Sequence, residues 1–272
     1  MKHKVAISVD PVVLRQVDGL VAKGSFRSRS HAMEALLAQS LRAQTTGAAL
    51  ILAGGLGTRL RPFTYEIPKP LIPIKDKPIL QWQVDMLKQY GIPSIFSSIG
   101  YKAEKVRAGI TGSKFIEEKE PAGTGGAVAL ALPHLPAETF LVMNGDILFE
   151  AFPDVAELYA FHKDQGCLAT LVLLPAENRA QGVVKMAGNK IVSFLEKPEN
   201  VAFGLISAGV YLFEPGIAPY LKPQCSLERE VFPKLAAEGK LAGYVFESKL
   251  YDIGTPEGYE QVLKEWTPYL LP

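Results

Sequence analysis

Apolar residues change their spacing along the chain from residue 48 onward. Short continuous apolar runs, typical of buried strands, alternate with stretches in which apolar residues recur every three or four positions, as on one face of a helix. This alternation predicts strands at 48–53, 94–99, 114–118 and 139–143 and helices at 78–90, 102–110 and 124–132. Residues 47–272 are therefore predicted to form an α/β domain with a Rossmann-like mixed sheet, whose ligands bind beyond the carboxyl ends of the strands.

The first 46 residues follow another pattern. Residues 4–9 alternate apolar and polar side chains as a strand does, and two short amphipathic helices follow. Gly24 separates these helices, and Ser28 or Ser30 caps the second one. One strand and two short helices cannot bury their apolar faces alone. We therefore expect residues 1–46 to be a separate module that forms a homodimer by pairing its strand with that of a second copy.

The chain of 272 residues has a formal net charge of +1, so charge alone suggests no polyanionic partner. The charge is uneven, because residues 1–46 carry seven basic and three acidic side chains, a local net charge of +4. No apolar run reaches the ~18 residues that span a bilayer, and no secretion signal opens the chain. We therefore expect a cytoplasmic protein without a membrane partner. Cys167 and Cys225 lack metal-ligand spacing and are expected to be reduced thiols.

A glycine-rich run follows the first predicted strand of the domain. Glycine lets the backbone turn sharply and direct successive N–H groups at phosphate oxygens, and an arginine adds a planar fork of donors. The run lacks the Lys-Ser/Thr end of Walker-type ATPases and the third glycine of the dinucleotide fingerprint, so it predicts a different triphosphate-binding loop. The residues expected to bind nucleotide here are Leu52, Ala53, Gly54, Gly55, Gly57, Thr58 and Arg59.

Three further features carry candidate chemistry. Lys69 lies among prolines that fix the backbone and so limit the entropy lost when the cation grips a phosphate. A second glycine-rich segment, residues 117–127, can admit a flat base, with a structural turn as the alternative. Asp146 follows a predicted strand and has an oxygen ligand suited to Mg²⁺, although a single Asp there is as often a turn residue or helix cap.

Residues 54–73 resemble the opening motif of the sugar-1-phosphate nucleotidyltransferases, G-G-x-G-T-R-L-x-P-x-T followed by P-K-P, at every fixed position. The resemblance covers residues 48–265 and implies transfer of a nucleotidyl group from an NTP to a sugar 1-phosphate, with release of pyrophosphate. It implies that Arg59 and Lys69 neutralise the triphosphate. The family's E-P-x-G-T-x-G-A segment holds base and ribose, and Gly123, Thr124, Gly125 and Gly126 match it. Glu118 and Pro121, in the same stretch, are also expected to bind the nucleotide.

The resemblance also covers the metal and the sugar phosphate. Residues 251–257 resemble the motif D-I-G-T-P-E, which implies that Asp252 shares Mg²⁺ with Asp146; two carboxylates plus triphosphate oxygens complete such a shell. The motif F-x-E-K-P at 194–198 implies that Lys197 holds the sugar phosphate and Glu196 binds sugar hydroxyls. The sugar-phosphate contacts expected besides these are Asn144, Gly182, Ser207, which replaces a common Asn, and Glu228, whose role can be structural alone. The catalytic set is Arg59, Lys69, Asp146, Lys197 and Asp252.

Residues 100–105 and the sequence Gly-Thr-Gly-Gly at 123–126 are more similar to heptose- or mannose-1-phosphate guanylyltransferases than to other members of the family. GTP is therefore the favoured nucleotide. Uridylyl- and thymidylyltransferases are the near alternatives. A DNA-binding regulator whose nucleotidyltransferase-like domain senses nucleotide sugars is the alternative from another class. The intact catalytic set argues against that regulator.

Residues 3–42 resemble the ribbon-helix-helix family of repressors and antitoxins. The resemblance implies that the outward strand residues Lys4, Ala6 and Ser8 read duplex DNA in the major groove, although Ala6 offers a base no hydrogen bond. Arg27, Ser28 and Arg29 would contact phosphate near the start of the second helix. A dimerisation module without DNA binding is the alternative, and autoregulation of its own operon is a third possibility.

Overall fold

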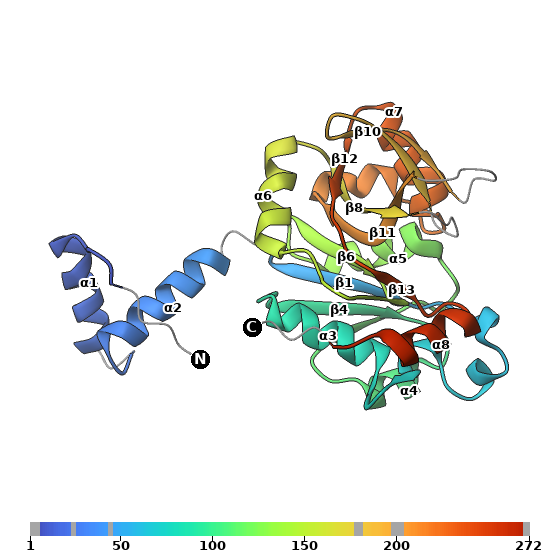
Figure 1. Cartoon of the computed structure of the whole chain (residues 1–272), viewed down its shortest axis with the longest axis horizontal. Helices are drawn as coiled ribbons and strands as arrows, with labels where there is room; N and C mark the ends of the chain where they lie inside the picture. Colours follow the sequence, from blue (N-terminus) through green and yellow to red (C-terminus); the bar gives the residue numbers. More distant parts are fainter. Residues whose placement is uncertain (1–5, 23–25, 43–45, 177–181, 197–203, 269–272) are drawn as a thin grey trace. The chain divides into compact units, whose positions relative to one another are not determined.

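The computed structural model describes residues 6–22, 26–42, 46–176, 182–196 and 204–268. Contacts within the chain divide it into two compact units, residues 1–44 and 45–272 (Figure 1). In the described part of the chain, none of the helices combines the length and the apolar character needed to cross a bilayer.

The first unit contains α1 (Pro11–Ala22) and α2 (Arg29–Arg42). The Asp10 carboxylate accepts the Val12 N–H at 2.6 Å, and Ser28 Oγ accepts the His31 N–H at 3.2 Å. Both helices therefore begin at a side-chain cap, and Ser28 is the cap of the second one.

The predicted strand of this unit lies partly outside the described residues, since the structure describes it only from Ala6. Residues 6–10 have no regular secondary structure in the single chain. A lone strand has nothing to pair with, because its hydrogen bonds would come from a second copy. The pairing therefore stays a prediction.

The second unit is built on a nine-stranded mixed sheet with strand order β5-β4-β1-β6-β11-β8-β12-β10-β9. β5, β4, β1 and β6 run parallel, and β11 adds antiparallel to β6. The strands are β1 (Ala48–Ala53), β4 (Ser94–Ile99), β5 (Lys114–Glu117), β6 (Phe140–Asn144), β8 (Ala169–Ala176), β9 (Val183–Ala187), β10 (Lys190–Leu195), β11 (Gly204–Phe213) and β12 (Leu241–Val245). The parallel half confirms the predicted strand-helix alternation, with every predicted element within one residue of its observed ends.

Alternate residues of β1 belong to two different cores, as the two-residue period of a strand requires. Ala49 and Ile51 pack in one cluster with α3 (Ile79–Gln89), α4 (Ala103–Gly109) and α6 (Val155–Gln165), whereas Leu50 packs in the other with α5 (Gly123–Ala131) and α7 (Phe232–Ala237). Figure 1 shows α3 and α4 drawn below the parallel strands and α5 above them. Helices thus cover both faces of the sheet.

Two short two-stranded sheets lie outside the main sheet. β7 (Ile147–Phe149) pairs with β13 (Leu250–Asp252), and β2 (Pro73–Ile74) pairs with β3 (Lys77–Pro78). α8 (Pro256–Glu265) follows β13. These pieces share a third apolar cluster, which consists of Leu60, Ile72, Ile74, Ile79, Leu148, Tyr251, Ile253, Val262 and Trp266.

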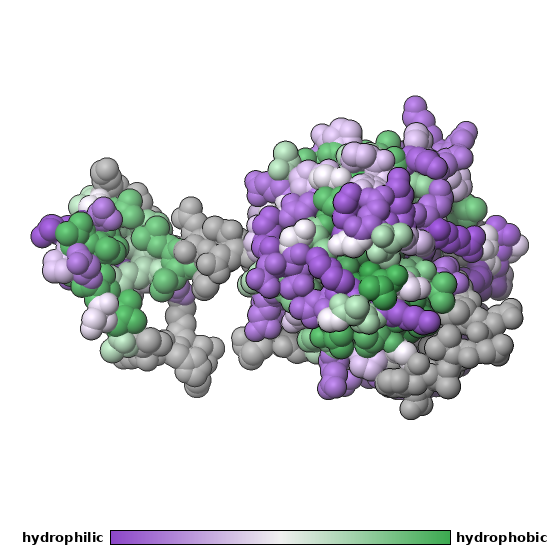
Figure 2. Space-filling model, turned by 90° about the horizontal axis from the view of Figure 1, so that it is seen from above, coloured by the Kyte–Doolittle hydropathy of each residue, from purple (hydrophilic) through white to green (hydrophobic). Residues whose placement is uncertain are grey.

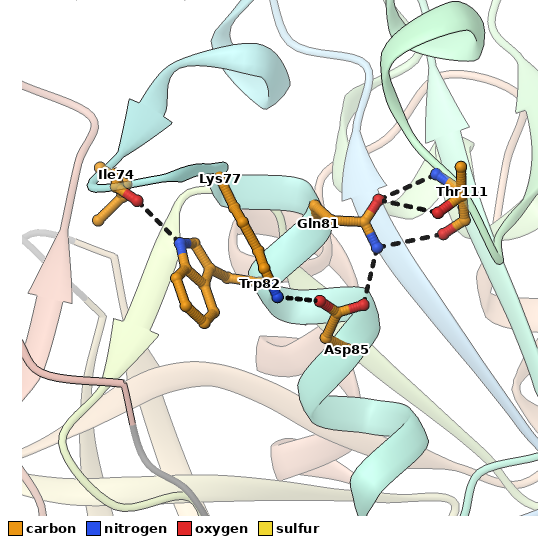
Figure 3. A network of polar contacts seen from close by, with 6 residues as sticks. All are labelled: Ile74, Lys77, Gln81, Trp82, Asp85 and Thr111. Atoms are coloured by element: carbon orange, nitrogen blue, oxygen red, sulfur yellow. Dashed lines mark hydrogen bonds and ion pairs between the residues drawn. The ribbon is translucent and has the colours of Figure 1, made fainter.

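The start of α3 is held by side-chain hydrogen bonds at several points (Figure 3). Gln81 donates to Asp85 at 2.8 Å and accepts the Thr111 N–H at 2.9 Å. Lys77 bonds the other Asp85 oxygen at 2.8 Å, and the Trp82 indole N–H donates to the Ile74 carbonyl at 2.9 Å. The start of α3 is therefore tied to its surroundings at several points.

Candidate active site

Two cavities adjoin at the carboxyl ends of β1 and β6. Their volumes are about 310 Å³ and 140 Å³, and both are lined by Asn144 and Asp146. The larger contains most of the predicted nucleotide contacts: Leu52, Ala53, Gly54, Gly55, Lys69, Glu118, Pro121, Gly123 and Thr124. The smaller contains Gly182, Glu196, Ser207 and Glu228, predicted for the sugar phosphate, together with Arg59 and Asp252. Lys197, the remaining predicted catalytic residue, lies outside the described residues.

The two predicted metal carboxylates come together through the pairing of β7 with β13. Asp252 lies opposite Ile147 in the register of these strands, and the Ile253 N–H donates to the Asp146 carbonyl at 2.9 Å. Burial raises the pKa of Asp252, and the nearby negative charge of Asp146 raises that pKa further. The two side chains are therefore close enough to repel each other.

Two cations border this carboxylate pair. Lys69 Nζ lies 2.5 Å from Asp146 Oδ2, and the Lys69 side chain is 13% exposed. The Arg59 guanidinium and the Asp252 carboxylate both lie against Gly254, and the Gly254 N–H donates to Asp252 Oδ1 at 2.6 Å. The ion pair of Lys69 with Asp146 is a contact that the sequence did not predict. Each carboxylate thus has a neighbouring cation that can turn to an incoming phosphate.

The two carboxylates, Asp146 and Asp252, are suited to bind a divalent cation. Both carboxylates supply hard oxygen ligands, and Mg²⁺ is usually held by one or two carboxylates together with substrate phosphates. A divalent charge between them would also relieve the repulsion that raises the pKa of Asp252. Asp146 and Asp252 are the residues that would hold the ion.

A carboxylate also lies in the wall of the larger cavity. Glu118 Oε1 accepts the Ser98 hydroxyl at 2.6 Å. Its side chain packs so closely on Gly54 that a Cβ atom at position 54 would collide with it. A glycine at this position is therefore needed to bring the Glu118 carboxylate into the cavity.

Three predicted nucleotide contacts within the described part of the chain, Gly57, Thr58 and Gly125, line neither of these cavities. Gly57 has a φ of 64°, a left-handed conformation that favours glycine, and precedes the 3₁₀ helix Thr58–Leu60. The Gly125 N–H donates to the Cys225 carbonyl at 2.9 Å. These residues shape the two glycine-rich loops.

The smaller cavity is joined to the larger one by Glu228. Glu228 Oε2 accepts the hydroxyls of Thr124 at 2.6 Å and of Ser226 at 2.8 Å. Glu228 belongs to a π-helix, Leu227–Val231, in which Glu230 rather than Glu228 reaches back to the Ser226 N–H, at 3.0 Å. The Ser226 hydroxyl also accepts the Arg229 N–H at 3.2 Å, so Ser226 caps this helix.

Ser98 and Gln83 are buried polar residues near the site that were not predicted from the sequence. Ser98 interrupts the apolar strand β4 and is fully buried beside Glu118. Gln83 occupies a position on the apolar face of α3, together with Leu80, Val84 and Leu87, and is fully buried. A polar residue at a position where periodicity demands an apolar one was the signal available for both.

Replacing Asp252 by Asn should separate stability from turnover. Because the pKa of Asp252 is raised in the fold, its ionisation costs stability that is present at low pH and is lost as the pH rises through that pKa. At pH 8 without metal, Asp252→Asn should stabilise the protein by about 0.5–2 kcal/mol. It should lower turnover with Mg²⁺ by about a hundredfold or more.

Thermal unfolding and pyrophosphate release measure the two effects. Asp164→Asn, which changes an exposed carboxylate, is the control and should change neither quantity. A destabilised Asp252→Asn variant with normal turnover would contradict the assignment.

Comparison with known proteins covers the same part of the chain. The sequence profile of the Nucleotidyl transferase family matches residues 48–267. The chain is 38% identical over 228 residues to a probable mannose-1-phosphate guanylyltransferase 3 of Oryza sativa subsp. japonica, covering 78% of this chain and 62% of the relative. It is 37% identical over 227 residues to mannose-1-phosphate guanyltransferase beta-B of Xenopus laevis, with the same coverage. The chain thus spans about three fifths of the length of these curated relatives.

A solved structure shares the fold. HddC from Yersinia pseudotuberculosis, complexed with GMP-PN, matches with a TM-score of 0.67 at 28% identity over 80% of this chain and 98% of HddC. Both cavities are built from segments inside the matched region. The chain therefore belongs to the Nucleotidyl transferase family.

Proposed function

We propose that this protein transfers a nucleotidyl group from GTP to mannose 1-phosphate or a heptose 1-phosphate, giving a GDP-sugar and pyrophosphate. The meeting of the two cavities at Asn144 and Asp146 is the observation that carries the proposal. A nucleotide in the larger cavity and a sugar phosphate in the smaller would bring their phosphates to the same turn, beside both carboxylates and both cations.

The reaction needs no nucleophile from the protein. A phosphate oxygen of the sugar 1-phosphate, already ionised at neutral pH, attacks the α-phosphorus, and the bond from that phosphorus to the pyrophosphate oxygen breaks. Lys69 and Arg59 offset the charge on the phosphates, and the cavity walls align the two substrates. Mg²⁺, when bound, adds positive charge beside the triphosphate.

Glu118 supports guanine as the base. Guanine presents an N1–H and an N2 amino group on one edge, and a carboxylate can accept from both. Uracil and thymine present a single N–H between two carbonyl oxygens, which a carboxylate would repel. The names of the plant and frog relatives and the GMP-PN complex of HddC agree with this preference. Uridylyl or thymidylyl transfer is the alternative.

The sugar identity rests on the smaller cavity and on the relatives. Its wall contains the carboxylates Glu196 and Glu228 and the hydroxyls of Ser207 and Tyr211, all of which can bond sugar hydroxyls. The relatives from rice and frog are named for mannose 1-phosphate. Mannose 1-phosphate is therefore the first substrate to test.

The N-terminal unit is proposed to be a homodimerisation module. Figure 2 shows apolar residues over much of the visible surface of α1 and α2. Ile7, Val12, Val13 and Leu37 are 59%, 53%, 48% and 56% exposed in the single chain. A unit this small gains stability by burying such residues against a second copy.

The described contacts favour self-association over DNA binding. Arg29, one of the predicted phosphate contacts, is bonded to Asp18 at 2.5 and 2.7 Å. The Ser28 hydroxyl caps α2. Lys4 lies outside the described residues, and Ala6 and Arg27 are exposed. A nucleotide-sugar-sensing regulator would need DNA binding as well as nucleotide binding, so the test below includes DNA.

A screen for pyrophosphate release tests the proposed enzyme. The purified chain should release pyrophosphate only with Mg²⁺, an NTP and a sugar 1-phosphate together, and fastest with GTP and mannose 1-phosphate. If none of the tested pairs of NTP and sugar 1-phosphate gives pyrophosphate, the proposal is wrong. Equal rates with UTP would contradict the guanine assignment alone.

Glu118→Gln should weaken the use of GTP. The amide keeps the shape of the side chain but turns one acceptor into a donor that faces the guanine donors. We expect the KM for GTP to rise by about tenfold or more, with less effect on the KM for sugar phosphate. Glu117→Gln is the matched control, because Glu117 is paired with Arg107 outside both cavities. Equal effects of the two substitutions would show that Glu118 does not bind the base.

Deleting residues 1–44 should leave turnover within about twofold while halving the mass of the assembly in light scattering. Thr46 must be kept, because its buried hydroxyl bonds the start of β1 at Ala48. An assembly that keeps the same number of chains after the deletion would refute the dimerisation module. Fluorescence anisotropy at low salt tests duplex DNA; salt-sensitive binding by the full chain that the deletion abolishes would favour the regulator.

A further inference from the structure

Gln83 lies directly behind the turn that carries Asp146. It projects from α3 and is fully buried. Its side-chain Nε2 donates to two backbone carbonyls, those of Asn144 and Ile147, each at 2.9 Å. These two residues flank Gly145 and Asp146, so one amide group spans the whole turn.

The two carbonyls require a donor of this kind. Both carbonyls bond the amide of the fully buried Gln83, and an unpaired buried carbonyl is costly. A primary amide has two N–H groups and no charge, so it can serve both oxygens at one point. An apolar side chain of the same length would leave both unpaired, and a carboxylate would repel them.

The rest of the turn is held by backbone hydrogen bonds. The Gly145 N–H donates to the Leu52 carbonyl at 2.9 Å, and the Asp146 carbonyl accepts the Ile253 N–H at 2.9 Å. The Gln83 pair is the restraint that a side chain places on the backbone of the turn, whereas Lys69 contacts the Asp146 carboxylate itself. Gln83 is therefore where substitution can loosen the turn without changing the strands that flank it.

We propose that Gln83 is a positioning residue, which fixes the Asp146 carboxylate relative to Asp252 and so sets the affinity of the pair for a divalent cation. The proposal rests on the proposed function, because it takes the two carboxylates as the metal ligands. Gln83 itself touches neither cavity. It acts through the 144–147 backbone, as groups behind metal ligands commonly do.

The anchoring of α3 explains how the Gln83 amide can hold the backbone of residues 144–147 in place. Gln81, Lys77 and Trp82 tie the start of the helix to its surroundings by the bonds drawn in Figure 3. The Gln83 side chain therefore extends from a fixed support. The Gln83 Oε1 atom has no hydrogen-bond partner among the described residues, so the donor end of the amide carries the contact.

The test compares Gln83→Met and Gln83→Glu with Gln81→Met in the full-length chain. Gln83→Met keeps the length of the side chain and removes both donors, and Gln83→Glu keeps the shape and makes it an acceptor. Gln81→Met removes one anchor of the start of α3 and leaves the Lys77–Asp85 and Trp82–Ile74 bonds in place, so it controls for a general loss of stability while the support of Gln83 is largely kept. Two quantities are measured for each variant: Mn²⁺ binding by electron paramagnetic resonance without substrate, and the Mg²⁺ concentration for half-maximal pyrophosphate release.

Both Gln83 variants should bind Mn²⁺ about tenfold or more weakly and need correspondingly more Mg²⁺, while the KM for NTP at saturating Mg²⁺ stays close to that of the wild type. Gln81→Met should leave metal affinity unchanged even if its Tm falls. Variants with wild-type metal affinity and a lowered Tm would overturn the proposal and leave Gln83 a structural residue. If Gln83→Met fails to fold, Gln83→Glu decides alone, and failure of both to fold would overturn the positioning role.

The wild type separates this proposal from the proposed function. Wild-type protein that binds Mn²⁺ through Asp146 and Asp252, but transfers no nucleotidyl group, would refute the function and leave the Gln83 comparison valid. Wild-type protein without Mn²⁺ binding would overturn the carboxylate site and the role of Gln83 together.

Discussion

Two strands of three residues each, β7 and β13, bring Asp146 and Asp252 together. Their register sets Asp252 opposite Ile147, the neighbour of Asp146, and the Ile253 N–H bonds the Asp146 carbonyl. A one-residue shift would turn Asp252 to the opposite face, so the ladder fixes the approach of the carboxylates despite their repulsion. Burial raises the pKa of Asp252, and the nearby charge of Asp146 raises it further. A divalent cation between the two carboxylates would offset their repulsion, and that gain would contribute to the affinity for the cation.

The third apolar cluster explains how four distant segments support this pairing. Leu60 follows Arg59, Ile72 lies three residues after Lys69, Leu148 belongs to β7, and Tyr251 and Ile253 flank Asp252. Arg59, Lys69, Asp146 and Asp252 each lie within three residues of a member of this one buried cluster. Close packing of such a cluster resists movement of any member, which holds the site charges in place.

The parallel half of the sheet could be predicted from the sequence because its signal is local. Continuous apolar strands and helical stripes repeat within 20 residues or so, and β1, β4, β5 and β6 lie where the periodicity predicted them. The candidate site was predicted through motif resemblance, and the structure brings most of those residues to two adjoining cavities. The role of each residue stays a prediction.

Contacts between distant segments could not be predicted from periodicity. Gln83 bonds a residue 61 positions away, and Thr124 bonds Glu228 across 104 positions. A period reports which face of an element is buried, but not which atom lies against it. The π-helix that carries Glu228 was not predicted either, because π turns are rare and hydrophobic periodicity does not mark them. The predicted N-terminal strand is a different case, because residues 6–10 have no regular secondary structure in the single chain and pairing with a second chain stays a prediction.

The proposed function requires one divalent cation between Asp146 and Asp252, beside the substrate phosphates. Crystals of the protein soaked with Mn²⁺ and a GTP analogue that cannot be cleaved would test it by anomalous scattering. We expect one Mn²⁺ peak that lies within about 2.5 Å of a carboxylate oxygen of Asp146, a carboxylate oxygen of Asp252 and a phosphate oxygen. A peak that contacts neither carboxylate, with the nucleotide bound in the larger cavity, would contradict it.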